Sequence, residues 1–297
     1  MSQKIELLDE LIELLPRIVS LHSRSSAIYK VIDDSIIEAL RTSSLMDPVN
    51  GQINLGEIGP LQFPYTNMGA IDSIDLFGLD ELILFSFYWV NRNRYKRVAD
   101  VGANLGLHSL VMSRCGWEVM AYEPDPRHVK LIQRNFRLND LESVELSEVA
   151  ISGSAGVREF VRVLGNWTGS HLAGAKDNPY GELERFDVEV VSPKEIFSQC
   201  DLIKLDVEGE EASILLSSQF RDWNGTDVIA EIGNPSNANL IFKHLGKIGV
   251  NCFPQKIGWR LAREIADMPT SYREGNVFFS LSKSMSWQNQ VDPAVPN

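Results

Sequence analysis

The spacing of apolar residues predicts an amphipathic helix at the start of the chain. Leu8, Leu11, Ile12 and Leu15 recur every three or four residues, with acidic residues between them. That period is typical of a helix with one buried face. We expect this face to pack on the chain's own core; the alternative is a coiled-coil-like seam between two copies, which would make a homodimer through the N-terminal helices.

The remainder of the N-terminal region has a mixed pattern. A second helical run covers about 27–40, and the Gly-, Pro- and Asn-rich stretch over 47–69 predicts turns with short strands. Residues 1–75 are therefore predicted to form a helical and irregular N-terminal extension. A helix over 79–91 then leads into a domain that spans residues 76–297.

From residue 97 onward, short β-branched runs alternate with helical ones, which is the pattern of βαβ units on a parallel sheet. The predicted class is α/β, with a doubly wound and mostly parallel sheet. The expected strands lie near 97–101, 117–122, 144–150, 157–163, 202–206, 227–232, 250–254 and 276–281. The expected helices lie near 106–115, 126–138, 193–199, 209–218 and 237–247. An insert over 164–187, rich in Gly, Asn, Asp and Pro, is predicted to be a loop with a lid or substrate-binding role.

A glycine-rich turn joins the first of these strands to the next helix. Gly102 and Gly106 flank it, and glycine lets backbone N–H groups approach a ligand closely. Their G-x-x-x-G spacing differs from the G-x-G-x-x-G of nicotinamide dinucleotide sites. Glu123 ends the following strand, where a carboxylate can accept hydrogen bonds from two ribose hydroxyls. The turn and the acid together predict a nucleoside-bearing cofactor.

A lysine lies inside the strand predicted over 202–206. Burying the Lys204 ammonium is costly without a partner, and its candidate partners are the carboxylates of Asp206, Glu208, Glu231 and Glu123. One interpretation is that this pair only braces the sheet. The other is that it belongs to a reactive site, because ligands of open α/β sheets bind at the carboxyl ends of the strands.

Several of these motifs resemble the FkbM family of methyltransferases: residues 100–106, Glu123 with Pro124, Asn135 with Asn139, and residues 201–211. The D-x-I-K-x-D-x-E-G-x-E pattern of the last segment is the most specific. The resemblance covers about residues 97–254. It implies a Rossmann-like class I methyltransferase fold and methyl transfer from S-adenosyl-L-methionine, which leaves S-adenosyl-L-homocysteine. The usual acceptor is a hydroxyl of a carbohydrate or a polyketide-like natural product.

The resemblance also implies where the cofactor binds. The methionine end is expected at Asp100 and Gly102, the ribose at Glu123, and the adenine near the end of the third strand. The full set of expected cofactor contacts is Asp100, Gly102, Ala103, Asn104, Gly106, Glu123, Pro124, Glu148, Val149 and Ala150. The Asn104 side chain is expected either to bind the methionine carboxylate or to brace the turn.

The reaction needs a base beside the acceptor hydroxyl. Methyl transfer to oxygen is an in-line displacement, and a carboxylate or imidazole can take the hydroxyl proton. Asp206 is the first candidate, with Lys204 as its neighbour, and Glu208 is the second. His171 in the insert is a third, because an ordinary histidine pKa suits proton transfer near neutrality. A metal is not predicted; magnesium on oxygen ligands is the alternative.

Charge and composition narrow the acceptor and the location. A net charge of −12 argues against a nucleic-acid acceptor, which leaves a small molecule or a glycan. The three cysteines form no Cys-x-x-Cys pair, and no apolar run approaches the roughly 18 residues of a membrane span. We therefore expect a cytoplasmic protein. Acceptor specificity is expected in the N-terminal extension, the insert and the loop over 254–274.

Other functions remain open from the sequence. Transfer to nitrogen or to a carboxylate shares the cofactor half of the site, but the Asn-Pro-Pro-Tyr-type motif of amide and base N-methyltransferases is absent after the strand predicted over 202–206. A non-catalytic scaffold that kept the fold is the remaining alternative, and the intact Gly102, Gly106 and Glu123 argue against it.

Overall fold

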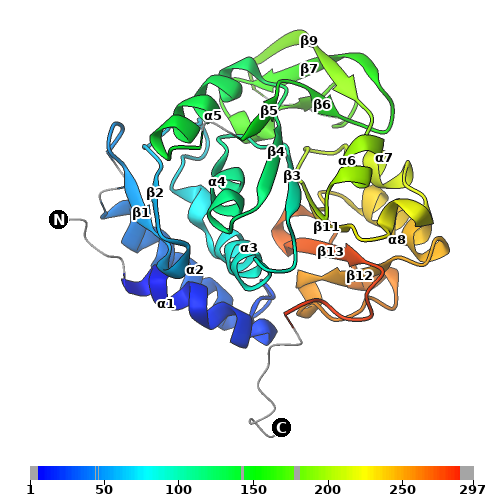
Figure 1. Ribbon diagram of the computed structural model, residues 1–297, viewed down its shortest axis with the longest axis horizontal. Coiled ribbons are helices and arrows are strands. Elements are labelled where there is room, and N and C mark those ends of the chain that lie inside the picture. The colour runs from blue at the N-terminus through cyan, green and yellow to red at the C-terminus, as the bar shows by residue number, and fades with distance from the viewer. Residues whose placement is uncertain (1–5, 44, 46, 142–143, 177–180, 288–297) are drawn as a thin grey trace, which may run out of the picture.

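A seven-stranded sheet forms the centre of the computed structural model (Figure 1), which describes residues 6–43, 45, 47–141, 144–176 and 181–287. The strand order is β12-β13-β11-β10-β3-β4-β5. The five strands from β11 to β5 run parallel, and β13 is antiparallel to both of its neighbours. Their bounds are β3 Arg97–Val101, β4 Glu118–Tyr122, β5 Glu145–Ser147, β10 Leu202–Leu205, β11 Asp227–Glu231, β12 Asn251–Pro254 and β13 Asn276–Ser280. The predicted α/β fold with a mostly parallel sheet is confirmed.

Helices cover both faces of this sheet because its strands are apolar on both sides. Val98 of β3 and Leu202 of β10 point into one hydrophobic cluster, and the next residues along, Ala99 and Ile203, point into the other. The first cluster includes residues of α3 Leu79–Val90, α4 Leu107–Arg114 and α5 Pro126–Leu138. The second includes residues of α6 Lys194–Gln199, α7 Glu211–Leu216 and α8 Pro235–Lys247.

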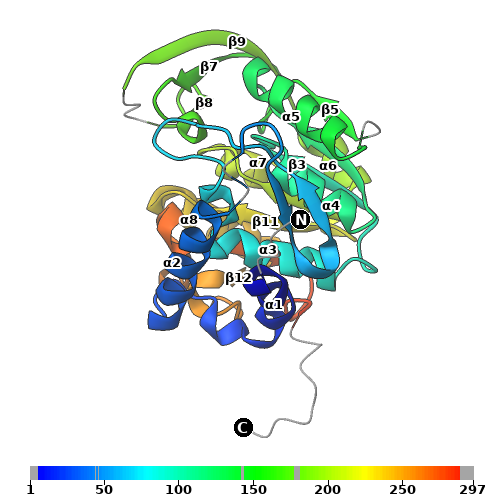
Figure 2. The same cartoon turned by 90° about the vertical axis from the view of Figure 1, so that its left-hand side faces the viewer.

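The N-terminal region packs on the α3 side of the sheet. It contains α1 Glu6–Leu14, α2 Ala27–Arg41 and the antiparallel pair β1 Gln52–Asn54 and β2 Pro60–Gln62. Leu8, Leu11, Ile12 and Leu15 are buried and belong to the same cluster as α3 and α4. Figure 2 shows α1 and α2 beside α3. The apolar face predicted for the first helix is thus covered by the chain's own core.

A second, four-stranded sheet stands over one end of the molecule (Figure 2), with the order β6-β9-β7-β8. Its strands are β6 Ala150–Ile151, β7 Gly156–Val163, β8 His171–Leu172 and β9 Leu183–Val191. Two predictions were wrong here. The insert over 164–187 is not one loop, because β9 begins at Leu183 and pairs with all of β7. The strand expected over 144–150 is two strands, β5 and β6, in different sheets.

The described residues contain no helix with the length and apolar character that a membrane span requires.

Candidate active site

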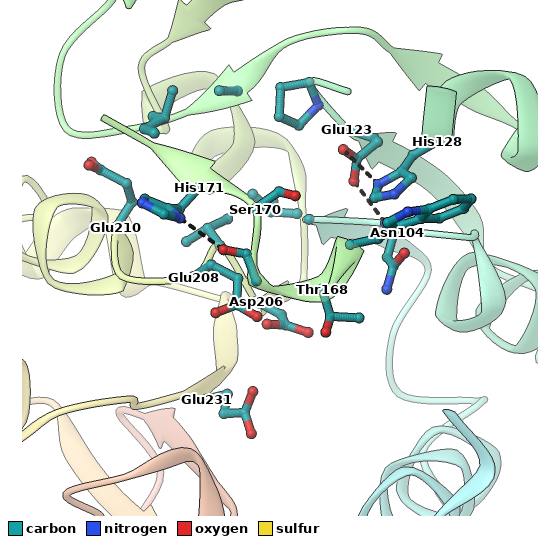
Figure 3. Close-up of a pocket in the computed structure, with 18 of the residues that line it drawn as sticks. Asn104, Glu123, His128, Thr168, Ser170, His171, Asp206, Glu208, Glu210 and Glu231 are labelled. Atoms are coloured by element: carbon teal, nitrogen blue, oxygen red, sulfur yellow. Dashed lines mark hydrogen bonds and ion pairs between the residues drawn. The ribbon is translucent and has the colours of Figure 1, made fainter. Parts of the chain in front are cut away.

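A cavity of about 530 Å³ lies at the carboxyl ends of β3, β4 and β10 (Figure 3). Its volume falls in the range of about 300–1,000 Å³ that is typical of small-molecule sites. The sequence-predicted residues that line it are Gly102, Asn104, Glu123, Pro124, Val149, Ala150, His171, Asp206 and Glu208. The predicted residues that do not line it are Asp100, Ala103, Gly106, Glu148 and Lys204. Residues far apart in the chain therefore meet at one site.

The glycine turn fits closely against the neighbouring strand. Gly102 has a φ of +85°, and a Cβ built there would lie 1.8 Å from the backbone carbonyl oxygen of Asp206. Any side chain at this position would therefore collide with the end of β10. Asn104 also adopts a positive φ, of 53°, and its Oδ1 has no hydrogen-bond partner among the described residues. The N–H groups of Gly102 and Ala103 both donate to the Tyr122 carbonyl oxygen at 3.0 Å, so the turn is held against β4 while Gly102 and Asn104 line the cavity.

The Glu123 carboxylate is fixed at the end of β4. One oxygen accepts the Asn104 N–H at 2.9 Å, and the other accepts the Asp125 N–H at 2.9 Å. The Nδ1 atom of His128 lies 3.5 Å from the same carboxylate. Burial lowers the pKa of His128, but the bond and charge of Glu123 outweigh that effect and raise it overall. These contacts orient the carboxylate on the cavity wall.

Lys204 pairs with two carboxylates behind the cavity. Its Nζ lies 3.3 Å from Asp206 Oδ2 and 3.7 Å from Asp100 Oδ1. Burial lowers the pKa of Lys204, but Asp206 and then Asp100 outweigh it and raise the pKa overall. Asp100 is fully buried and also accepts a hydrogen bond from Ser109 Oγ at 2.6 Å. The predicted pairing with Asp206 is present; the pairing with Asp100 was not predicted.

Glu208 and Glu231 both face the cavity, but only Glu208 has an ion-pair partner among the described residues. Burial raises the pKa of Glu208 to about 7, while the ion pair with Lys176 opposes this and Asp206 adds to it. Glu231 ends β11, and no side-chain hydrogen bond or ion pair holds its carboxylate among the described residues. Burial, then Asp206 and Glu208, raise the pKa of Glu231 well above its ordinary value. The cavity thus holds more carboxylate than its own cations neutralise.

His171 lies in a different setting from the one predicted. The sequence suggested an exposed loop, but His171 begins the short strand β8 and is 2% exposed, because β8 pairs with β7. Its Nδ1 lies 2.8 Å from the Gly169 carbonyl oxygen. Burial lowers the pKa of His171, so the ring is neutral near pH 7 and can accept a proton.

The N-terminal extension closes one side of the cavity. Its residues Ile71 and Asp75, together with Leu76 directly after it, line the wall. The loop over residues 66–72 is hydrogen-bonded to the beginning of the insert. The Ala70 N–H donates to Gly165 O at 2.8 Å, and the Trp167 N–H donates to Met68 O at 3.0 Å. We call these two loops, residues 66–72 and 164–170, the clasp.

The loop over 254–274 also reaches the site, through Tyr272. All three segments expected to carry acceptor specificity therefore line the cavity. Sequence reasoning did not identify Ile71, Lys176 or Tyr272 individually, because no local motif marks them. Among the described residues, no group of three or more His, Cys, Asp or Glu side chains is arranged to hold a metal ion.

Comparison with known proteins gives one family. Residues 100–239 match the family model described as "Methyltransferase FkbM domain". "Methyltransferase sdnD" of Sordaria araneosa is 29% identical over 176 residues, which are 47% of this chain and 67% of that protein. The family resemblance seen in the sequence is confirmed, and it supports S-adenosylmethionine as the cofactor.

Solved methyltransferase structures resemble the chain more distantly. The S-adenosylmethionine-dependent methyltransferase of Agrobacterium tumefaciens has 11% identity and a TM-score of 0.35, covering 67% of this chain and 61% of that one. The S-adenosylhomocysteine-bound PaMTH1 of Podospora anserina has 9% identity and a TM-score of 0.34, covering 67% of this chain and 77% of that one.

Proposed function

We propose that this chain, whose residues 100–239 match the model of the FkbM methyltransferase domain, transfers the methyl group of S-adenosylmethionine to a hydroxyl oxygen of a carbohydrate or related natural product. The observation that carries the proposal is the meeting of two groups of residues in one cavity. The glycine turn and Glu123 form one wall, and Asp206 and Glu208 form another.

The cofactor part of the cavity suits an adenosyl group. The Glu123 carboxylate is already oriented by two backbone N–H groups, so binding two ribose hydroxyls requires little rearrangement. Val149 and Ala150 offer an apolar surface for the adenine. At the methionine end, Gly102 leaves room for the ligand by having no side chain, and the Asn104 side-chain amide is available to bind it. When bound, the cofactor supplies the electrophilic methyl group.

The base is proposed at the end of β10. Asp206 accepts the hydroxyl proton, and Lys204, whose Nζ lies 3.3 Å from Asp206 Oδ2, holds this carboxylate in place. Glu208 is the second candidate, since a pKa of about 7 suits proton transfer near neutrality. His171 is the third, as a buried neutral imidazole on the same cavity. Lys204 acts as a positioning residue through Asp206.

The surroundings favour transfer over loss of the methyl group to water. Residues of the clasp and of the second sheet line one side of the cavity, and the carboxyl ends of the central strands line another. A site lined from both sides can hold the hydroxyl in line with the methyl group and limit the access of competing water. The cavity volume suits a small-molecule or glycan acceptor, and the net charge of −12 disfavours a nucleic acid.

The experiment that tests this proposal uses S-adenosylmethionine labelled with ¹³C in the methyl group. The protein is incubated with a panel of sugars and hydroxylated natural products, and the chemical shift of the labelled product reports whether the methyl sits on oxygen or nitrogen. We expect an O-methyl product, and Asp206→Asn should slow its formation by about 10²-fold or more. Glu57→Gln, which changes an exposed carboxylate, is the matched control. A methyl group found on nitrogen or on a carboxylate would contradict the proposal.

A further inference from the structure

A second cavity, of about 350 Å³, adjoins the first. The two share five wall residues, Ile71, Asp75, Glu81, Asp206 and Glu231. The second cavity extends away from the glycine turn toward α2 and the start of α3, where Arg24, Tyr29 and Leu79 line it. An acceptor whose hydroxyl lies at Asp206 would therefore place another part of its structure in this second space.

The wall of the second cavity is strongly acidic. Six carboxylates line it, those of Asp33, Asp75, Asp80, Glu81, Asp206 and Glu231, whereas its cations are Arg24 and Lys204. Carboxylates buried together repel one another unless each has a cation or hydrogen-bond donor. The hydrogen-bond and ion-pair partners of each carboxylate therefore show which one a ligand could bind.

Five of these six carboxylates are satisfied by the chain itself. The donors are Arg24 and Tyr29 for Asp80, His108 for Glu81, Lys204 for Asp206, Arg41 for Asp75 and the Leu79 backbone N–H for Asp33. These groups hold α2 and α3 against the sheet. Each of these five carboxylates thus has at least one hydrogen-bond donor or cation within the chain, although the wall as a whole stays acidic.

Glu231 is the exception. Its carboxylate lines both cavities, and no hydrogen bond or ion pair to it is found among the described residues. Figure 3 shows its side chain directed into the open space beneath Asp206. Lys204, the buried cation on the neighbouring strand, is engaged by Asp206 and Asp100 instead. Burial, and then the neighbouring carboxylates Asp206 and Glu208, raise the pKa of Glu231, and a bound cation would oppose this rise.

We propose that the methyl acceptor carries a protonated amino group, and that Glu231 binds this ammonium in the second cavity while the hydroxyl to be methylated lies at Asp206. The inference rests on the proposed function and names its substrate class: an amino sugar or a comparable amino alcohol. An ammonium donates hydrogen bonds to the carboxylate and matches its charge, which makes the contact stronger than one between neutral groups. Phosphorylated or carboxylated acceptors are disfavoured, because the wall would repel them.

The test uses matched pairs of sugars that differ in one charge. Glucosamine, galactosamine and mannosamine are each paired with their N-acetyl forms, and binding to the protein saturated with S-adenosylhomocysteine is measured by calorimetry. At least one amine should bind about tenfold or more tightly than its acetylated form. Glu231→Gln should remove that preference and leave binding of the acetylated sugar unchanged. Glu57→Gln, the exposed control, should keep the preference.

The outcomes separate this inference from the proposed function. If S-adenosylhomocysteine does not bind the unaltered protein, the proposed function fails. If it binds, but no amine is preferred or Glu231→Gln keeps the preference, the inference alone is overturned. Glu231→Gln must also bind S-adenosylmethionine and S-adenosylhomocysteine as the unaltered protein does. A selective loss of S-adenosylmethionine would assign Glu231 to the sulfonium charge and overturn the inference.

Discussion

Replacing Lys204 by methionine tests the buried charge pair that joins two strands beneath the site. The side chain of Lys204 is 8% exposed, and its ammonium lies between Asp100 on β3 and Asp206 beyond β10. Methionine fills a similar length without the charge. The variant leaves Asp100, which is fully buried, with a single hydrogen bond from Ser109. The Oδ1 atom of Asp100 has no hydrogen-bond donor among the described residues even in the unaltered protein.

The size of the effect follows from which partner is buried. Removing one member of a buried ion pair costs about 3–5 kcal/mol, because the other charge stays in a poorly solvated place. Asp206 adds little to this figure, since its side chain is 34% exposed and water can solvate it. We expect Lys204→Met to lower the free energy of unfolding by about 3–5 kcal/mol, or the melting temperature by roughly 6–20 °C.

Urea unfolding followed by circular dichroism measures this change. Lys243→Met, on an exposed position of α8, is the control and should stay within about 0.5 kcal/mol of the unaltered protein. The double variant Lys204→Met with Asp100→Asn should recover about 2 kcal/mol of the free energy of unfolding, because the buried Asp100 no longer carries an unpaired charge. A loss below about 1 kcal/mol in Lys204→Met, or no recovery in the double variant, would refute the reasoning.

Three further variants test the site and its surroundings. Gly102→Ala places a Cβ 1.8 Å from the Asp206 carbonyl oxygen, so calorimetry should show at least tenfold weaker binding of S-adenosylhomocysteine. Unchanged affinity would show that the glycine turn does not form part of the cofactor site. Gly69→Ala brings a Cβ 2.2 Å from Gly165 O and should open the clasp, seen as faster hydrogen exchange over residues 164–170; equal exchange would mean that the clasp does not hold the insert. Because burial raises the pKa of Glu208 from an ordinary 4.5 to about 7, the folded state keeps a proton that the unfolded chain loses between these values. Stability should therefore fall as pH rises through this window, by up to about 1.4 kcal/mol per pH unit, and less steeply in Glu208→Gln. Urea unfolding at pH 5 and pH 7 checks this, and identical slopes in the two proteins would rule out the raised pKa.

The parts of the fold that follow local patterns could be predicted from the sequence. Except for β5 Glu145–Ser147, the strands of the central sheet contain a short apolar run, and Glu123 can be placed because it directly follows one. The β9 strand was missed because the residues that precede it, from 164 onward, have the composition of a loop. Within β9, charged residues alternate with Phe186, Val188 and Val190. A pattern with one exposed face was thus interpreted as part of a loop.

Contacts between distant segments could not be predicted, because they depend on register and packing. Lys204 faces Asp100 only because β10 and β3 align these two residues side by side. His171 is buried only because β8 pairs with β7. The clasp joins residues nearly a hundred positions apart. Glu231 has no partner within the described part of the chain only because its neighbours satisfy one another. Such features depend on the three-dimensional arrangement rather than on any single motif.

Calorimetric titration with S-adenosylhomocysteine tests the central claim most directly. The unaltered protein should bind one molecule per chain. Glu123→Gln should bind it at least tenfold more weakly, because the carboxylate on the cavity wall can no longer accept two hydrogen bonds from the ribose. Thermal unfolding of both proteins shows that the variant is folded. Absence of binding by the unaltered protein, or equal affinity in a folded Glu123→Gln variant, would contradict the account.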